Sequence, residues 1–512
     1  RPPFRSLAPS PRDPHQPSPT PSPDQHPPLS RSPLLIPTPP PQSSSTPLSI
    51  TDDQVRSQLK KIKARKAPGP DGISPRLLKD CADQLCGVIR LLFNLSLSLE
   101  KVPALWKTSC VVPVPKTPRP KEPNHFRPVA LTSHLMKTME RIILRHLRLL
   151  VGTQLDPLQF AYQPGIGVDD SVTYLLHRSL LHLEDSRNTV RVMFFDFSSA
   201  FNSIQPSLLK VKMENVGVDQ HLAAWTTDYL TKRPQYVRLH HCVSDVVLCS
   251  TGAPQGTVLS PFLFTLYTSD FTHNTTHCHI QKFSDDTAIV GCVPEGNDLE
   301  YRAVITDFVS WSELNQLQLN TSKTKEMIVN FRKKASNLTP VNIQGLDIEV
   351  VENYKFLGVH LNNKLDWSDN THALYKKGQS RLHLLRRLRS FGVCRALLRT
   401  FYDSVVASAI FYAVVCWRGG STDRDRSRLN RLIRRASSVL CCPLDSIEEV
   451  GDRRMLAKLA SIMGNTSHPL HDIVGSLSSS FSSRLLHPRC KKERFRRSFI
   501  PAAVRLYNTS TT

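Results

Sequence analysis

Residues 278–292 read CHIQKFSDDTAIVGC, and this stretch decides the fold. Two apolar runs, Cys278 to Phe283 and Thr287 to Cys292, flank the dipeptide Asp285-Asp286, which predicts a β-hairpin with both acids at its turn. Neighbouring residues in such a turn point to different sides, so we expect Asp285 and Asp286 to contribute unequally. Taken alone, the dipeptide is weak evidence of function, because Asp is common in turns.

A third acid, Asp196, closes another apolar run. Residues 189–197 read TVRVMFFDF and predict a buried strand. A carboxylate at the end of a buried strand needs a partner, because desolvating its charge alone is costly. Two such acidic sites predict a place for Mg²⁺, which prefers carboxylate oxygens. Two metal ions about 4 Å apart would activate an attacking hydroxyl and stabilise a leaving pyrophosphate.

A glycine-rich loop lies between the two acidic sites along the chain. Residues 252–256 read GAPQG, and the apolar run from Phe262 to Tyr267 that follows predicts a helix. Glycines let a backbone approach a flat base pair, proline stiffens the turn, and Gln255 offers an amide. An ordinary strand-to-helix loop is the alternative.

Proline and charge divide the rest of the 512-residue chain. Seventeen of the 39 prolines lie in residues 1–50, so we expect a disordered linker there. Residues 376–512 hold 26 basic and 9 acidic residues, a net charge of +17 out of +23, as expected of a surface that meets phosphate. A merely well-solvated basic helical region is the alternative.

The apolar runs and the cysteines bear on the cellular environment. The longest apolar run, Ser404 to Trp417, is too short to span a membrane and predicts a buried helix. The first apolar cluster, Leu34 to Ile36, is too short for a signal peptide. Twelve cysteines in so long a chain predict reduced thiols in the cytosol or nucleus. Because the chain starts at Arg rather than Met, we expect further sequence upstream.

The remaining periodicity predicts several further elements. These are a helix capped by Ser49 or Thr51 that runs to about Lys66, a short strand at Ser109 to Val114, an amphipathic helix at Thr132 to Leu150, a strand at Tyr354 to Leu361, and basic helices from residue 371 onward.

In their order along the chain, these segments resemble the reverse transcriptase domain of LINE-type (non-LTR) retrotransposons, over about residues 60–365. The matching stretches are KAPGPDG at 66–72, VPVPK at 112–116, FRPVAL at 126–131, QFAY at 159–162, FDFSSAF at 195–201, GAPQG at 252–256, FSDD at 283–286, LNTSKTK at 319–325 and YKFLG at 354–358. Each stretch is weak alone, but their common order makes coincidence negligible. One departure is Phe283-Ser284, where the family usually has an aromatic residue followed by Ala.

The resemblance implies an α+β fold of the right-hand polymerase type. After a linker at residues 1–48, the fingers and a palm with a small antiparallel sheet would fill residues 49–365. A helical thumb would follow at residues 366–440, and a basic helical C-terminal extension at residues 441–512. Basic clusters in both segments suit the backbone of an RNA–DNA duplex. The thumb would hold Arg386-Arg387 and Arg434-Arg435, and the extension would hold Lys491 to Arg497. The N-terminal endonuclease of such a retrotransposon polyprotein is not found in this chain and is expected upstream.

The resemblance also assigns roles residue by residue. Asp196 and Asp285 match the family's metal ligands, and Asp286 matches their less strictly required neighbour. The nucleotide-binding residues would be Lys116 and Arg127 on the triphosphate, Phe201 as the bulky gate under the sugar, Gln255 beside the incoming nucleotide, and Lys323 on the pyrophosphate. Lys325 is a near-even alternative to Lys323, and the stretch at 354–358 matches the turn that supports the primer end.

The implied function is an RNA-directed DNA polymerase, a nucleotidyltransferase that adds dNTPs to a primer 3′-hydroxyl. It would use two Mg²⁺ ions, with Mn²⁺ as a substitute, in target-primed reverse transcription. Its partners would be an RNA template, a DNA primer or nicked target DNA, and dNTPs, without a membrane, in a ribonucleoprotein of the nucleus and cytoplasm. Two rivals stay open: a catalytically inactive nucleic-acid-binding remnant or domesticated scaffold, and a maturase of a mobile intron.

Overall fold

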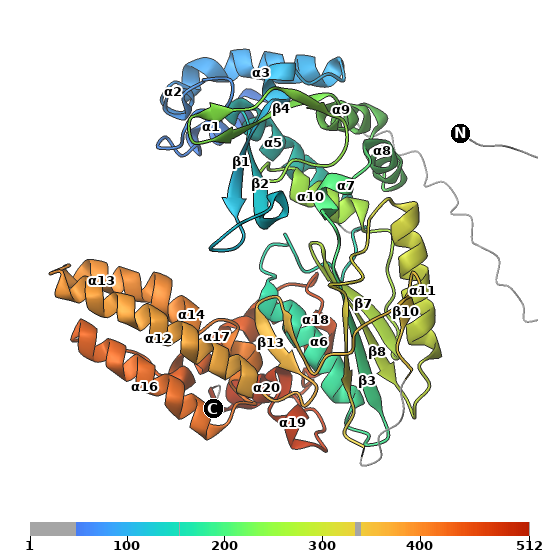
Figure 1. The fold of residues 1–512 in the computed structure, drawn as a ribbon, viewed down its shortest axis with the longest axis vertical. Helices are drawn as coiled ribbons and strands as arrows, with labels where there is room; N and C mark the ends of the chain where they lie inside the picture. Colours follow the sequence, from blue (N-terminus) through green and yellow to red (C-terminus); the bar gives the residue numbers. More distant parts are fainter. Residues whose placement is uncertain (1–47, 153, 333–338, 511–512) are drawn as a thin grey trace, which may run out of the picture. The chain divides into compact units, whose positions relative to one another are not determined.

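The hairpin predicted around Asp285 forms one half of a four-stranded sheet in the computed structural model, with its first strand at the edge. Strand β7 (Cys278–Phe283) pairs with β8 (Asp286–Val293), β8 pairs with β3 (Thr189–Phe195), and β3 pairs with β9 (Lys325–Val329), all antiparallel (Figure 1). Every residue of β3 is buried. The predicted α+β fold with a small antiparallel palm sheet is therefore confirmed.

The apolar sequence of β3 follows from its position between two hydrophobic cores. Successive side chains of a strand point to opposite faces of the sheet. Val190, Val192 and Phe194 accordingly pack in the core that includes helix α6 (Val168–His182). Met193 and Phe195 pack in the core that includes helix α11 (Leu299–Leu314). Figure 1 shows α6 and α11 on the two sides of the sheet.

The structure describes residues 48–152, 154–332 and 339–510, which all lie within one compact unit. The predicted linker at 1–48 thus falls almost wholly outside the described residues. Because chain contacts do not divide the described residues, the predicted borders at 365–366 and 440–441 stay predictions.

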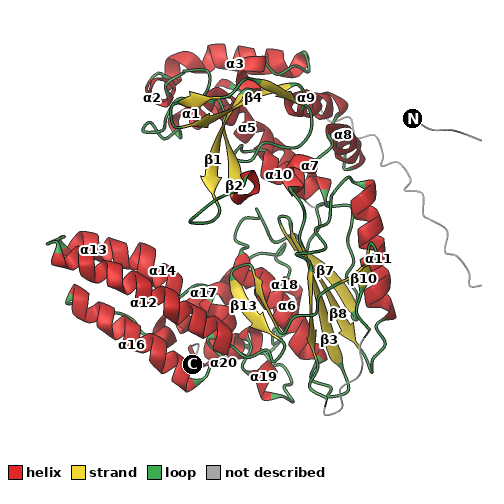
Figure 2. Ribbon diagram, viewed as in Figure 1, coloured by secondary structure: helices red, strands yellow, loops and turns green. Residues whose placement is uncertain are grey.

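The region predicted as fingers and palm, residues 49–365, also contains a second sheet that is flanked by helices (Figure 2). In this sheet β1 pairs with β2 and β4, and β4 also pairs with β5 and β6. Its strands are β1 (Ser109–Pro115), β2 (Phe126–Leu131), β4 (Arg233–Leu239), β5 (Cys242–Val243) and β6 (Val247–Cys249). The helices here are α1 (Asp52–Lys60), α2 (Pro75–Asp80), α3 (Ala82–Ser98), α4 (Ala104–Lys107), η1 (Pro123–His125), α5 (His134–Val151), α7 (Ala200–Ser203), α8 (Pro206–Asn215), α9 (Gln220–Leu230) and α10 (Ser260–Tyr267).

Beyond β9 the chain forms two short strand pairs and then becomes helical. The pairs are β10 (Asn342–Ile343) with β11 (Leu346–Asp347), and β12 (Asn353–Phe356) with β13 (Val359–Asn362). The helices are α12 (Ser368–Ser390), α13 (Arg395–Phe401), the π-helical η2 (Tyr402–Ala407), α14 (Ser408–Ile410), α15 (Val414–Trp417), α16 (Asp423–Leu440), α17 (Ile447–Met463), α18 (His471–Gly475), α19 (Glu493–Arg496) and α20 (Phe499–Ser510).

Three predicted elements need correction. Thr51 does cap α1, but the helix ends at Lys60 rather than near Lys66. The strand predicted at Tyr354 to Leu361 is a hairpin, because Leu357 and Gly358 both have positive φ and turn the chain between β12 and β13. The predicted buried helix at Ser404 to Trp417 is interrupted at Ala413, whose φ is 50°.

The same region holds a helical stretch whose length and composition would allow it to cross a membrane. It runs from Arg395 to Trp417 and is the one such stretch among the described residues. More than half of its apolar window, 56%, is buried inside the protein. That extent of burial is typical of a core helix.

Residues of the predicted C-terminal extension pack against palm helix α6. Lys458 Nζ lies 2.8 Å from Asp170 Oδ2, and His468 Nε2 lies 3.1 Å from Asp170 Oδ1. At the other end of α6, the backbone N–H groups of Lys491 and Lys492 both donate to the Glu184 carboxylate. These contacts tie residues 441–512 to the palm by the same helix that covers the central sheet.

Candidate active site

Strand register brings Asp196 next to the Asp285-Asp286 dipeptide. In the β3–β8 pair, Phe195 lies opposite Thr287. One step further, Asp196 leaves β3 where Asp286 begins β8, so the two acids meet at the same end of the sheet although 90 positions separate them in the chain. Asp196 is anchored there because its carbonyl accepts a hydrogen bond from Asn320 N (2.8 Å).

Ser284 and Asp285 form the two-residue turn of the hairpin between β7 and β8. Phe283 pairs with Asp286, and Ser284 has a φ of 63°, in the left-handed region. Such a tight turn aims neighbouring side chains in different directions. Asp285 is half-buried beside the turn, whereas Asp286 is exposed at the start of β8.

The three carboxylates carry more negative charge than the surrounding side chains offset. Burial raises the pKa of Asp285, and the charge of Asp196 adds to this while Arg127 opposes it. Partial burial and then the charges of Asp285 and Asp196 raise the pKa of Asp286 to about 6, although its side chain reaches the open cavity. Asp196 Oδ2 is buried and has no hydrogen-bond partner among the described residues.

Lys323, rather than Lys325, is the lysine beside the acids. Lys323 Nζ lies 3.5 Å from Asp196 Oδ2, and its side chain remains 68% exposed. Lys325 points elsewhere: its Nζ donates to Glu349 Oε2 and to the Ser322 carbonyl, both at 2.7 Å. The geometry therefore places Lys323 in the site.

The two fingers cations lie on the same β-hairpin. Lys116 follows β1, and its Nζ donates to the Asn124 carbonyl (3.0 Å). Arg127 lies in β2, where it pairs with Val114 of β1. Both side chains are exposed and line the cavity that holds the carboxylates.

The loop with Gln255 is held against the fingers. Ala130 N of β2 donates to the Gln255 carbonyl (2.7 Å), and Val258 N donates to the buried Glu140 carboxylate. Gly252 has a φ of 71°, and a Cβ there would lie 2.7 Å from the Cα of Asn202, so only glycine fits.

The ring of Phe201 is fixed by its neighbour. It stacks on Phe264 of α10 with centroids 4.7 Å apart and an interplanar angle of 23°. A ring held in this way cannot swing aside easily, which suits a residue that excludes bulk.

One cavity of about 980 Å³ joins all of these side chains. It is lined by every predicted site residue, namely Lys116, Arg127, Asp196, Phe201, Gln255, Asp285, Asp286 and Lys323, and Lys325 is not among its lining residues. Tyr162 also lines it and was not assigned a role from the sequence, although it belongs to the QFAY stretch. The assigned roles themselves stay predictions.

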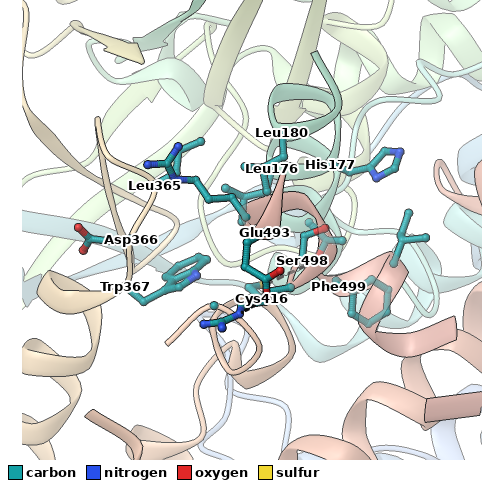
Figure 3. Close-up of a pocket in the computed structure, with 15 residues that line it drawn as sticks. Leu176, His177, Leu180, Leu365, Asp366, Trp367, Cys416, Glu493, Ser498 and Phe499 are labelled. Atoms are coloured by element: carbon teal, nitrogen blue, oxygen red, sulfur yellow. Dashed lines mark hydrogen bonds and ion pairs between the residues drawn. The ribbon is translucent and has the colours of Figure 1, made fainter. Parts of the chain in front are cut away.

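A second cavity lies elsewhere, next to α6, α15 and the C-terminal helices. Its volume is about 160 Å³, and much of its lining is apolar, as with Leu176, Trp367 and Phe499 (Figure 3). It contains none of the predicted site residues.

The chemistry of the carboxylate cluster fits a divalent cation. Asp196 and Asp285 provide hard oxygen ligands. Asp196 Oδ2 accepts no hydrogen bond from the described residues, and its ion-pair partner Lys323 lies 3.5 Å away. Within the described ranges, no group of three or more His, Cys, Asp or Glu is already arranged to hold an ion. Water and substrate oxygens would therefore have to complete the coordination of an ion bound there.

Comparison with known families agrees with the geometry. The profile of the family "Reverse transcriptase (RNA-dependent DNA polymerase)" matches residues 114–361, which include every candidate site residue. Polymerases of this family generally use divalent metal ions. A second profile, "Alkylated DNA repair protein alkB homolog 8, N-terminal", matches residues 367–408, which lie in α12 to η2.

Curated relatives match a longer part of the chain. The RNA-directed DNA polymerase from mobile element jockey of Drosophila melanogaster is 26% identical over 73% of this chain and 42% of its own length. The probable RNA-directed DNA polymerases from transposon BS and transposon X-element of the same species are 24% and 27% identical, over 77% and 59% of this chain. This chain spans 34% to 45% of the length of these three relatives.

Among solved structures, telomerase of Candida tropicalis in complex with a telomeric RNA fragment covers 79% of this chain and 74% of its own. The identity is 12% and the TM-score 0.39. The family match over residues 114–361 and the curated relatives together confirm the resemblance to the reverse transcriptases of LINE-type (non-LTR) retrotransposons.

Proposed function

We propose that this chain is an RNA-directed DNA polymerase that extends a primer 3′-hydroxyl with dNTPs on an RNA template. The observation that carries the proposal is the meeting of Asp196 with Asp285 and Asp286 on a cavity that is also lined by Lys116 and Arg127. In its element, the enzyme would extend a nicked target end on the element's transcript.

The residues divide the work by their chemistry. Asp196 and Asp285 would hold two Mg²⁺ ions, with Mn²⁺ as a substitute, and Asp286 would adjust the local charge. Bound ions would activate the attacking hydroxyl and offset the charge of the leaving pyrophosphate. Lys116 and Arg127 would bind the triphosphate from the fingers side as a point charge and a planar fork.

The remaining side chains would select the incoming nucleotide and assist the release of pyrophosphate. Phe201, locked against Phe264, would collide with a 2′-hydroxyl and so favour dNTPs over rNTPs. Gln255 would lie beside the incoming nucleotide, since its loop is hydrogen-bonded to β2. Lys323 would steady or protonate the pyrophosphate, and its ion pair with Asp196 keeps it in reach.

The test is primer extension on poly(rA) with an oligo(dT) primer, dTTP and Mg²⁺. The wild type should incorporate dTTP, and Asp285→Asn should lose incorporation by at least about 1,000-fold, because it removes a ligand charge. Binding of the same duplex by filter retention should change less than about threefold, since phosphate contacts dominate affinity. A wild type that binds the duplex but never extends it would support the inactive scaffold instead.

A further inference from the structure

The turn that carries Asp285 is supported from outside the sheet by residues 158–162. This segment runs alongside β7: Phe160 N donates to the Lys282 carbonyl (2.8 Å), and Lys282 N donates to the Leu158 carbonyl (2.9 Å). Gln159 and Lys282 form a parallel β-bridge. The segment therefore extends the edge of the palm sheet as far as the turn.

Gln159 holds the backbone of the turn. Its side chain is only 3% exposed, and its Oε1 accepts a hydrogen bond from Ser284 N (2.9 Å) while its Nε2 donates to the Ser284 carbonyl (3.4 Å). One buried amide thus satisfies both backbone groups of a residue in the left-handed region. The conformation of Ser284 is consequently fixed before any substrate enters.

Tyr162 holds the side chain of the same residue. Its hydroxyl lies 2.9 Å from Ser284 Oγ, and either oxygen can be the donor. Gln159 therefore holds the backbone of Ser284 and Tyr162 holds its side chain. The residue that directly precedes Asp285 in the turn is thus fixed at both its backbone and its side chain.

The backbone of Tyr162 is itself strained. Its φ is 62°, which is uncommon for a residue with a side chain, and its carbonyl accepts a hydrogen bond from Arg148 Nη2 (3.1 Å). The ring is 44% exposed and lines the cavity of the carboxylates. Strain of this kind persists where the surroundings impose it, commonly at functional sites.

We infer that Tyr162 and Ser284 form a positioning pair that fixes the turn and so holds Asp285 at the cavity for metal binding. The inference rests on the proposed function, because it assigns these two residues to the site of that reaction. Neither residue is a metal ligand. Ser284 is also the position at which the chain departs from the Ala usual in the family, so the hydrogen bond with Tyr162 depends on that departure.

The experiment is a double-mutant cycle with Tyr162→Phe, Ser284→Ala and the double variant. In primer extension, each single variant should lower kcat about tenfold, as expected for loss of one hydrogen bond that positions a metal ligand. The KM for dTTP should stay within about twofold, because the triphosphate contacts are untouched. The double variant should also lose about tenfold rather than a hundredfold, since both substitutions remove the same hydrogen bond.

A second measurement does not depend on catalysis. Binding of Mn²⁺ to the purified chain, followed by the EPR signal of free Mn²⁺, should weaken about fivefold in each single variant and no further in the double variant. Tyr375→Phe is the matched control, because it removes a tyrosine hydroxyl that bonds Gln379 on α12, outside the cavity. The control should match the wild type in both measurements.

The outcomes separate the two proposals. An active wild type with variants that match it, or with independent losses that multiply in the double variant, overturns the positioning pair and leaves the polymerase standing. A wild type that binds Mn²⁺ with the pattern above but never extends a primer supports the pair and overturns the polymerase. A wild type that neither extends nor binds Mn²⁺ overturns both.

Discussion

The dipeptides Asp169-Asp170 and Asp285-Asp286 have opposite electrostatic surroundings. At Asp170, burial acts to raise the pKa, but the close approach of His468 and the hydrogen bond and charge of Lys458 outweigh it and hold the pKa below its usual value. At Asp286, burial and then the charges of Asp285 and Asp196 raise the pKa to about 6. The chain neutralises the first dipeptide with its own cations and leaves the second in need of cations from outside.

The difference shows that the residue types alone do not distinguish an aspartate with a structural role from an aspartate of a binding site. Asp169 also has its pKa raised by burial, but Lys458 opposes this, so even the less favoured member of the first dipeptide has a nearby cation. In the second dipeptide, no cation among the described residues opposes the raised pKa of Asp286, and Arg127 is the one cation that opposes the raised pKa of Asp285. Uncompensated charge at a cavity is a mark of a site prepared for ligands.

The largest expected effect comes from Asp196→Asn. It should reduce dTTP incorporation by at least about 1,000-fold, because it removes a ligand and its charge. The free energy of unfolding in urea should stay equal or rise, since one of three mutually repelling carboxylates is gone. A clear fall in stability would mean that Asp196 is a structural acid like Asp170.

Asp170→Asn should have the converse effect. It should lower the free energy of unfolding by about 3 kcal/mol, because Lys458 and His468 lose the charge they face in a buried setting. Incorporation per folded molecule should stay within about threefold. Urea unfolding and primer extension on the same preparation check both statements, and an activity loss larger than the folded fraction explains would erase the contrast.

Lys323→Ala examines whether a site cation behaves differently from a structural one. Incorporation should fall about a hundredfold, as for loss of a group that assists proton transfer or charge neutralisation. The exposed ion pair with Asp196 should contribute little to stability. Lys325→Ala is the matched control, because that lysine is paired with Glu349 instead. Equal losses in the two variants would contradict the assignment of Lys323.

The smallest effect concerns pH and His177, which lies on α6 and packs against Phe495 of the C-terminal region. Burial lowers the pKa of His177 to about 4, from 6.5 in the unfolded chain. The depressed pKa means that stability is fully present above pH 6.5 and is lost as pH falls toward 4. Between pH 7 and 5 the loss should be about 2 kcal/mol.

Urea unfolding of His177→Gln at the two pH values checks this prediction. The variant should lose about 2 kcal/mol less than the wild type between pH 7 and 5. His383→Gln, at an exposed position of α12, should keep the wild-type dependence. If both variants follow the wild type, the imidazole of His177 is not the group that titrates.

Much of the central sheet could be predicted because its strands are continuous apolar runs. Residues 189–195 and 278–283 needed no long-range information, and the ordered motifs placed Asp196 and Asp285 in one site. The hairpin at 353–362 could not be predicted from the apolar pattern, because that pattern does not indicate that the backbone of Leu357 is in the left-handed region. The sequence analysis does not predict strand β2, and Pro128 at its centre is unfavourable for a strand that the structure pairs along β1.

The unpredicted parts depend on contacts between distant segments. Nothing near Asp170 in the sequence indicates Lys458, which is 288 positions away. The partnership of Tyr162 with Ser284 spans 122 positions, and its only local sign was the replacement of Ala by Ser. The basic cluster from Lys491 to Arg497 suggested phosphate binding, yet Arg496 and Arg497 both pair with Glu493.

The register of β3 against β8 sets a strict limit on how this sequence can drift. A side chain in a strand changes face with each residue, so inserting or deleting one residue between Thr189 and Phe195 would turn Asp196 away from Asp286. Length changes in the surface loops carry no such penalty. Among decayed copies of such an element, a lost codon in either strand would therefore break up the carboxylate site even where all three aspartate codons survive.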